Sequence, residues 1–446
     1  MEFLQYPLAF IVTLGLLVTF HELGHFVIAR WSGVRVVRFS VGFGRPIWSG
    51  VDRHGTEFVL AAIPLGGYVR MLDEREPGQV EPAVPLKEDD VSYNSLTVWW
   101  RIAIAFGGPA ANFLLAIVVY WLLFVVGTTS VAPMLGAVDP ESVIGSAGVR
   151  ANQEILAIDD RRTVSWQQVN MALAGRLGDT GTIELEIRRP GSVNTIRAQL
   201  PITAWQQGVD EPAMFDSLGI VPSLPAFVAT VLADSPAQRG GMRQWDLIES
   251  IDGEPVDDWG HFVELVRAAP AQSLSVIVDR GGERVALQLV TEVRGAEAGE
   301  PHGYLGVGAH FVEHRYGLLA AIPLSIAETW DKTVLTLNLV KKMITGQVSV
   351  KNLAGPITIA KVAGDSARSG WNYFLGVLAL LSISLGVLNL LPIPILDGGH
   401  IMFFLTEVVI GRPVSERTQI VGTQIGLVLV AGLMIFAVYN DITRLF

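Results

Sequence analysis

The chain has 446 residues, half of them hydrophobic and only 17% charged, and its mean hydropathy is +0.43. This composition is typical of a membrane protein and excludes an ordinary soluble enzyme. The formal net charge of -11 argues against nucleic acid as a partner. The absence of cysteine excludes disulfides, thiolate metal sites and a catalytic cysteine.

Four apolar runs are long enough, at about 20 residues each, to cross a bilayer. They cover residues 7–29, 102–126, 371–396 and 420–439. The first run is not a convincing signal peptide, because residues 1–6 contain no Lys or Arg. We therefore predict a multi-span α-helical membrane protein with four transmembrane helices.

The distribution of basic residues predicts the orientation of these helices. Residues 30–101 contain nine Lys and Arg, no basic residue precedes the first run, and the C-terminal tail has only Arg444. Because short cytoplasmic loops are enriched in Lys and Arg, the loop between the first two helices is predicted to be cytoplasmic. Both chain ends and the long middle region then lie outside.

Residues 36–71 have the pattern of β-strands. They combine alternating apolar and polar residues with Gly-rich turns, and they are too apolar for a solvated loop. We predict a small β-sheet associated with the inner face of the membrane. The acidic, proline-containing residues 72–90 that follow predict a flexible loop.

The middle region contains an internal repeat. Residues 142–166 align without gaps with residues 235–259, at an offset of 235 − 142 = 93. A repeat of this length indicates two copies of one β-rich domain. The second copy, with "GGMRQWDLIESIDGEPV", resembles the PDZ fold, whereas the first copy has Gln153 where the second has Asp246. The sequence therefore predicts two external PDZ-like β-rich domains.

Residues 316–345 have a helical pattern, but Glu328, Asp331 and three lysines interrupt it too often for a fifth span. An amphipathic helix along the outer membrane surface fits this pattern. A soluble helix packed on the second PDZ-like domain is the alternative.

The first apolar run carries the motif H-E-x-x-H at His21, Glu22 and His25. On a helix, positions i and i+4 share a face, so both imidazoles can reach one metal ion, and the intervening glutamate can act as a base for water. The alternative is hydrogen bonding of these side chains to neighbouring helices, which does not need this spacing. The motif therefore predicts His21 and His25 as metal ligands and Glu22 as the catalytic base.

A hydrolytic zinc site has three protein ligands and a water molecule, so one ligand is missing. The third run ends in "NLLPIPILDGGH", where two prolines break the helix before Asp397. Spans two and three flank one external region, so spans one and three run in the same direction. The histidines and Asp397 then lie at one depth, about 6 to 12 Å from the inner boundary. We predict Asp397 as the third ligand; a helix-ending turn is the alternative role of "LDGG", and His400 is the competing ligand.

Together these motifs resemble the site-2 protease family of intramembrane zinc metalloproteases. The resemblance covers essentially the whole chain, including "GFG" at 42–44, "GGYVRM" at 66–71, "NLAGPITIAK" at 352–361 and "GRPVSER" at 411–417. It implies one zinc ion per chain. It also implies cleavage of single-span membrane proteins whose external part has already been trimmed, typically an anti-sigma factor of an envelope stress response, and removal of signal-peptide remnants.

The same resemblance implies a multi-pass protein of the bacterial inner membrane, surrounded by membrane lipid. The PDZ-like domains and both termini would be periplasmic, and the active site would lie near the cytoplasmic side. The expected segments, in chain order, are the first transmembrane helix with "HELGH" (1–30), a cytoplasmic, membrane-associated β-rich region and loop (31–97), the second transmembrane helix (98–126), PDZ-like domain 1 (127–215), PDZ-like domain 2 (216–298), an external amphipathic helix region (299–370), the third transmembrane helix ending in "LDGG" (371–396), a cytoplasmic loop (397–419), and the fourth transmembrane helix with the tail (420–446).

A substrate helix in lipid must unwind to expose its peptide bonds. Strand addition to an exposed edge of the 36–71 sheet would hold it extended and satisfy its backbone groups. The residues expected next to the substrate there are Gly42, Gly44, Gly66, Gly67 and Tyr68. For the glycines, simple turns are the alternative to close backbone approach.

Two further substrate contacts are predicted. Asn389 lies two turns before Asp397 and can bind substrate or orient the site, although an intramembrane Asn can also join helices. In "SLGIVP" at 217–222, Leu218, Gly219 and Ile220 resemble a PDZ carboxylate-binding loop that could capture a new C-terminus. The alternative, which we favour, is that the PDZ-like domains sterically exclude untrimmed substrates.

The sequence thus predicts an intramembrane zinc metalloendopeptidase. One alternative is a non-catalytic metal-binding scaffold that recruits exported proteins through its PDZ-like domains, but a scaffold does not need Glu22. Another is a metal transporter, which needs a chain of ligands across the membrane. Spans two and four offer only Asn112 and Gln424 as main polar groups.

Overall fold

The computed structural model describes residues 2–73, 87, 90–295 and 301–444, so most of the loop predicted at 72–90 lies outside the described residues. The chain divides into two compact units. The first comprises Met1–Gly127, Arg315–Lys341 and Val350–Phe446, and the second comprises Thr128–His314 and Lys342–Ser349.

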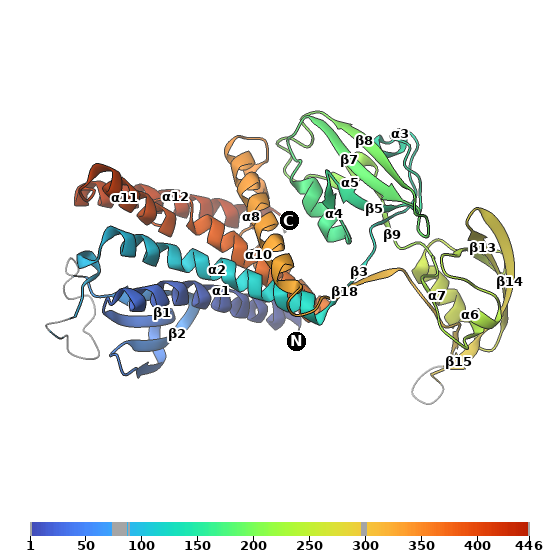
Figure 1. The fold of residues 1–446 in the computed structure, drawn as a ribbon, viewed down its shortest axis with the longest axis horizontal. Helices are drawn as coiled ribbons and strands as arrows, with labels where there is room; N and C mark the ends of the chain where they lie inside the picture. Colours follow the sequence, from blue (N-terminus) through green and yellow to red (C-terminus); the bar gives the residue numbers. More distant parts are fainter. Residues whose placement is uncertain (1, 74–86, 88–89, 296–300, 445–446) are drawn as a thin grey trace. The chain divides into compact units, whose positions relative to one another are not determined.

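Within the described residues, four helices of the first unit are long and apolar enough to cross a membrane (Figure 1). They are α1 (Glu2–Ser32), α2 (Val98–Val126), α10 (Trp371–Asn389) and α12 (Glu416–Thr443). The predicted four-span helical architecture is therefore confirmed.

The third span ends earlier than the sequence suggested. α10 stops at Asn389, and after a tight turn a further helix, α11 (Asp397–Ile410), begins. Pro392 and Pro394 cannot continue α10, because proline lacks the backbone N–H that a helix interior requires. Much of residues 397–419, expected as a loop, is therefore helical.

The first two spans, α1 and α2, cross so closely that their backbones are in contact. A Cβ added to Gly24 of α1 would lie 2.1 Å from the carbonyl oxygen of Gly107 on α2, and one added to Gly107 would lie 2.7 Å from that of Gly24. Membrane helices approach this closely only through small residues. Further along α2, Leu115, Val119 and Leu123 pack in one buried cluster that also contains Leu17 of α1 and Leu378 and Ile383 of α10.

The end of α12 is joined to α9 (Pro356–Ser369), which follows the 3-10 helix η2 (Val350–Asn352). The buried carboxylate of Asp441 accepts hydrogen bonds from the backbone N–H groups of Gly355, Ile357 and Thr358, at 3.1, 2.8 and 3.1 Å. A carboxylate at a helix N-terminus satisfies N–H groups that have no partner within the helix. This contact explains part of the "NLAGPITIAK" stretch, since a Cβ on Gly355 would collide with Asp441 at 2.4 Å.

The helix predicted within residues 316–345 is α8 (Ala321–Ile344). The chain just before it is bonded to α2, because Trp121 Nε1 donates to the Leu318 carbonyl at 2.9 Å. Lys332 Nζ lies 5.8 Å from the ring centroid of Tyr120 on α2. Ile322, Ile326 and Trp330 of α8 are exposed.

The sheet predicted at 36–71 consists of β1 (Val36–Val51) and β2 (Glu57–Met71), and η1 (Tyr93–Ser95) follows it. The two antiparallel strands are bent, so residues 36–41 of β1 pair with 67–71 of β2 on one side and with 57–60 on the other. Residues 48–51 pair with the outer side of 57–60. The hairpin is therefore a four-segment sheet in which residues 67–71 form one edge.

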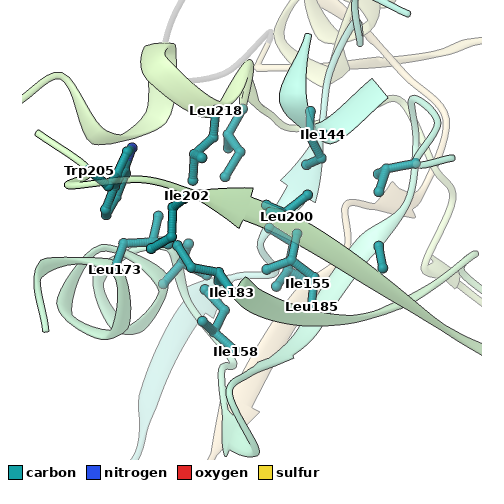
Figure 2. Packing of buried hydrophobic residues seen from close by; sticks show 14 of the residues in the cluster. Ile144, Ile155, Ile158, Leu173, Ile183, Leu185, Leu200, Ile202, Trp205 and Leu218 are labelled. Atoms are coloured by element: carbon teal, nitrogen blue, oxygen red, sulfur yellow. The ribbon is translucent and has the colours of Figure 1, made fainter. Parts of the chain in front are cut away.

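The second unit begins with a β-rich part whose sheet has the strand order β8-β7-β5-β4-β9. Its strands are β4 (Met134–Leu135), β5 (Glu154–Ile158), β7 (Gly181–Arg188), β8 (Thr195–Ile202) and β9 (Pro222–Ser223). A further short strand, β6 (Arg161–Arg162), pairs with β5. Its helices are α3 (Val143–Ser146), α4 (Trp166–Ala174) and α5 (Met214–Leu218). Figure 2 shows their apolar core, which includes Ile155, Leu185 and Leu200.

The following β-rich part has a sheet in the order β12-β11-β13-β14. These strands are β11 (Leu247–Ile251), β12 (Glu254–Pro255), β13 (Ser273–Arg280) and β14 (Glu283–Val290), and the helices are α6 (Pro236–Arg239) and α7 (Trp259–Arg267). Three short pairs complete the unit: β10 (Thr230–Val231) with β17 (Val307–Gly308), β15 (Glu292–Arg294) with β16 (His302–Tyr304), and β3 (Thr128–Val131) with β18 (Phe311–His314).

The sequence repeat corresponds to the same order of elements in both parts. Ser142 caps α3 and Ser235 caps α6 in the same way, each accepting a backbone N–H three residues on. The first part continues beyond residue 215, where the sequence analysis ended it, because β9 still pairs with β4. The chain returns to its first sheet before it enters the second.

We predict that Gly24→Ala destabilises the first unit by about 1 to 3 kcal/mol, because the new Cβ would meet the Gly107 carbonyl oxygen and force α1 and α2 apart. The measurement is thermal unfolding of the purified full-length protein in detergent. Gly15→Ala on the same helix is the matched control, since its Cβ would have no neighbour within 4 Å. Equal unfolding temperatures for the two variants would show that the close crossing contributes nothing to stability.

Candidate metal centre

Helix α1 presents the two motif histidines side by side. Their ring centroids are 4.8 Å apart, and the two Nε2 atoms are 3.2 Å apart. His21 is buried, with 8% of its surface exposed. The one-turn spacing of the motif thus brings two imidazole nitrogens to a common point, as the sequence predicted for i and i+4 positions.

Asp397, the first residue of α11, meets these nitrogens from the far end of the chain. Its Oδ2 lies 3.2 Å from His21 Nε2, and its Oδ1 lies 3.5 Å from His25 Nε2. Gly398 and Gly399 allow this approach, because a Cβ on either would lie 2.3 Å from a backbone carbonyl of the preceding turn. Steric exclusion of a Cβ therefore explains why glycine occupies both positions after Asp397 in "LDGG".

The three residues form a group whose ligand atoms all lie within 4.8 Å of one another. Two imidazole nitrogens and one carboxylate oxygen match the donor set of a catalytic zinc site, which keeps its fourth position open. The donor set and spacing therefore fit zinc. His400 does not belong to this group; its ring stacks on Phe404 at 6.5 Å instead.

Helix α2 contributes to the same site, which the sequence analysis did not predict. His25 Nδ1 is 2.7 Å from the carbonyl oxygen of Ile104, and His21 Nδ1 is 3.1 Å from the side-chain Nδ2 of Asn112. Gly108 lies between them, and a Cβ there would be 2.3 Å from His25 Nε2 and 2.7 Å from His21 Cε1. This part of α2 forms one wall of the site. The sequence feature that could have indicated it is "GGPAAN", two glycines followed by the one Asn of an apolar span.

Glu22 lies between the ligands and the sheet. Its carboxylate accepts the backbone N–H of Val69 and interacts electrostatically with both histidines and Asp397. A Cβ on Gly67, in the same edge segment, would lie 3.1 Å from Glu22 Cγ and 2.7 Å from the Ser40 carbonyl oxygen. The sheet edge therefore runs directly beside the residue expected to be the base.

The other glycines of the sheet have conformational reasons. Gly42, Gly44 and Gly66 have φ values of +91°, +90° and +143°, which side chains with a Cβ rarely adopt. A Cβ on Gly66 would also lie 2.2 Å from the Phe43 ring. Tyr68 stacks on Phe43 with centroids 6.2 Å apart, and its hydroxyl accepts from Arg38 at 3.4 Å.

Of two further polar residues that the sequence analysis considered, one faces the site and the other does not. The Nδ2 atom of Asn389, at the end of α10, is 3.5 Å from His21 Nε2, so this predicted substrate residue faces the site. Asp52, the first acid after the motif, is bound by Arg30 instead. Burial opposes the charge of Asp52, but hydrogen bonds from Arg30 and from the backbone of Thr56 and His54 hold its pKa below the usual value.

The predicted carboxylate-binding loop lies in the first β-rich part. Leu218 and Ile220 belong to its buried core, and a Cβ on Gly219 would be 2.4 Å from the Ser142 Cβ. The second part has an equivalent at Gly306, where a Cβ would be 2.4 Å from the Ser235 Cβ. The sequence analysis missed it because the spacings differ: 219 − 142 = 77, but 306 − 235 = 71.

The comparison with known families decides the classification. Residues 9–433 match the model of peptidase family M50. The chain belongs to this family. The site-2 protease resemblance drawn from "HELGH" and "LDGG" is thereby confirmed, and the chain is an M50 metalloprotease of the site-2 type with zinc as its cofactor. The alternative of a non-catalytic scaffold is set aside.

Full-length relatives carry consistent names. Protease RseP of Yersinia pestis is 41% identical over 448 residues, covering 98% of each chain. The regulator of sigma-E protease RseP of Escherichia coli K12 is 40% identical over 456 residues, covering 100% of each. A Vibrio cholerae protein named as a zinc metalloprotease is 38% identical over 450 residues, covering 98% of each. The four apolar helices and the M50 family fit a multi-pass inner-membrane protein.

We predict that Gly108→Ala lowers the zinc content of this M50 peptidase, because the new Cβ occupies the space of both imidazoles. The measurement is zinc per chain in the purified protein after dialysis against buffer of fixed free zinc. Gly376→Ala is the matched control, since this glycine of α10 has no neighbour within 4 Å of an added Cβ. Full zinc content in Gly108→Ala would contradict the view that α2 forms a wall of the site.

Proposed function

We propose that this M50 peptidase hydrolyses a peptide bond inside the membrane-spanning segment of single-span proteins. His21, His25 and Asp397 hold the zinc ion, and Glu22 is the general base. The observation that carries the proposal is the convergence of two Nε2 atoms from α1 and one carboxylate from the start of α11 beside a glutamate. Polar groups at this depth are costly without such a purpose.

Each side chain has a defined part in the reaction. Bound zinc supplies Lewis acidity, which polarises a peptide carbonyl and lowers the pKa of a water molecule to about 7. Glu22 takes the proton of the attacking water and later delivers it to the leaving nitrogen. Asn389, whose Nδ2 atom faces the site, donates a hydrogen bond that orients the substrate.

The substrate reaches the site as an extended strand added to residues 67–71. This segment is the edge of the four-segment sheet, and it passes within contact distance of Glu22 at Gly67. The Val69 N–H points away from β1 toward Glu22, so alternate residues of this edge offer their backbone groups outward. A strand bound here satisfies the peptide groups that a substrate helix loses on unwinding.

The substrate class follows from the relatives. Two of them are named for the regulation of sigma-E or as RseP, and this supports an anti-sigma factor, trimmed outside the membrane, as substrate, with signal-peptide remnants as further substrates. The nine basic residues within 30–101 support a cytoplasmic location for the first loop. The β-rich second unit and both termini are then periplasmic, and the site lies near the cytoplasmic side.

The two β-rich parts act as PDZ-like domains that exclude proteins with bulky external regions. This role follows from the need to admit only trimmed substrates. Capture of a new C-terminus by Leu218, Gly219 and Ile220 is the second candidate. It is favoured by the matching loop at Gly306, because both copies keep the same close contact with a capping serine.

We predict different outcomes for two neighbouring variants. Glu22→Gln keeps the zinc ion but lowers cleavage by about 10²- to 10⁴-fold, because proton transfer is lost. Asp397→Asn loses zinc and cleavage together, because the amide is a poor replacement for an anionic ligand. The measurements are zinc per chain and cleavage of a tagged single-span substrate without its external domain. Undiminished cleavage by Glu22→Gln, or full zinc content with full activity in Asp397→Asn, would refute the respective assignment.

Strand addition predicts that Met71→Pro weakens substrate binding. Met71 lies two residues beyond Val69 in the edge segment, so its N–H also points outward, and proline removes this donor while remaining tolerable on an edge strand. Binding is measured in the Glu22→Gln background by co-purification of the tagged substrate, so that loss of catalysis does not enter. Ser49→Pro, in the segment at the opposite edge, is the matched control. Equal substrate recovery with both proline variants would argue against strand addition at residues 67–71.

A further inference from the structure

Asn112 is a buried polar residue that the reaction as described does not use. It has no exposed surface in the described structure, and its side-chain amide faces His21 Nδ1 at 3.1 Å. Burying an amide in an apolar helix interface costs free energy unless it forms hydrogen bonds. The other amide atom, Oδ1, is buried and finds no partner among the described residues.

The two histidines have parallel arrangements. Both Nε2 atoms face Asp397, and both Nδ1 atoms face α2. A histidine that binds a metal through Nε2 carries its hydrogen on Nδ1, and a group that accepts this hydrogen fixes the ring. For His25 the acceptor is the Ile104 carbonyl, which can only accept.

For His21 the corresponding acceptor must come from Asn112. We propose that Asn112 is a positioning residue of the metal centre, whose side-chain oxygen accepts the Nδ1–H of His21 and so directs Nε2 toward Asp397. The amide needs only to turn over about its Cβ–Cγ bond, since its oxygen and nitrogen occupy equivalent positions. This turn gives the unpartnered Oδ1 a donor. The inference rests on the proposed function, because it takes His21 as a zinc ligand.

The position of Asn112 is itself fixed. Its backbone carbonyl accepts a hydrogen bond from the buried Ser382 Oγ at 2.8 Å, which ties α2 to α10. One turn earlier, Gly108 brings the helix against both imidazoles. A side chain held on a rigid helix in this way can set a ring orientation, as the outer partners of metal-binding histidines do.

The test compares Asn112→Leu with Asn112→Asp in the purified full-length protein in detergent. Zinc affinity is measured by competition with a chromophoric chelator. We expect Asn112→Leu to weaken zinc binding by about 10- to 100-fold, as loss of an outer hydrogen-bond partner does. Asn112→Asp should bind zinc at least as tightly as the unchanged protein, because a carboxylate accepts the Nδ1–H of His21.

Ser384→Ala on α10 is the matched control, since it removes a hydrogen bond within that helix, from Ser384 Oγ to the Leu380 carbonyl at 3.0 Å, that involves neither Asn112 nor His21, and it should leave zinc affinity unchanged. The proposal is overturned if Asn112→Leu binds zinc normally, if Asn112→Asp is as weak as Asn112→Leu, or if Ser384→Ala weakens binding equally. If Asn112→Leu does not fold, the comparison of Asn112→Asp with the unchanged protein decides. His21→Ala distinguishes a failure of the Asn112 proposal from a failure of the proposed zinc ligand set. Normal zinc affinity in His21→Ala refutes the ligand set itself.

Discussion

The backbone contact between Gly24 of α1 and Gly107 of α2 is the constraint on which the membrane unit depends. It brings α2 so close that a carbonyl oxygen and a side-chain amide reach the Nδ1 atoms of both histidines. Ionisable groups at membrane depth require partners, and larger residues at this crossing would hold α2 too far away to provide them. The close crossing and the polar site are therefore one structural solution, in which small residues create the room that the imidazoles fill.

How far the site could be predicted depended on the kind of group involved. The spacing of His21, Glu22 and His25 predicted that their side chains lie together, and the topology predicted that Asp397 lies at the same depth; the structure brings all four residues together. The Ile104 carbonyl could not be found, because every residue has a carbonyl and the sequence does not indicate which one faces a ring. Asn112 was visible as a polar residue in an apolar span, but its partner depends on how α1 and α2 rotate about their axes, and hydropathy carries no information on rotation.

The fold was predictable where burial follows a simple period, as in the four spans. It was less so where the chain changes direction. The prolines before Asp397 predicted that α10 would end, but not that α11 would begin at Asp397 itself. In the 36–71 sheet the strands were expected, yet their division into four segments depends on bends at glycines such as Gly42 and Gly44, with φ near +90°. The sequence analysis did not detect that the repeat includes the loops at Gly219 and Gly306, because these loops follow the capping serine at different spacings in the two copies.

The start of α11 at Asp397 has a consequence for the life of the protein before it is complete. During translation, α1 leaves the ribosome with its histidines and glutamate long before the carboxylate is made, because the whole second unit lies between them in the chain. In the proposed site, a nascent chain is therefore a hydrolase without its third ligand. On this proposal, the chain gains peptidase activity only after the start of α11 has been made.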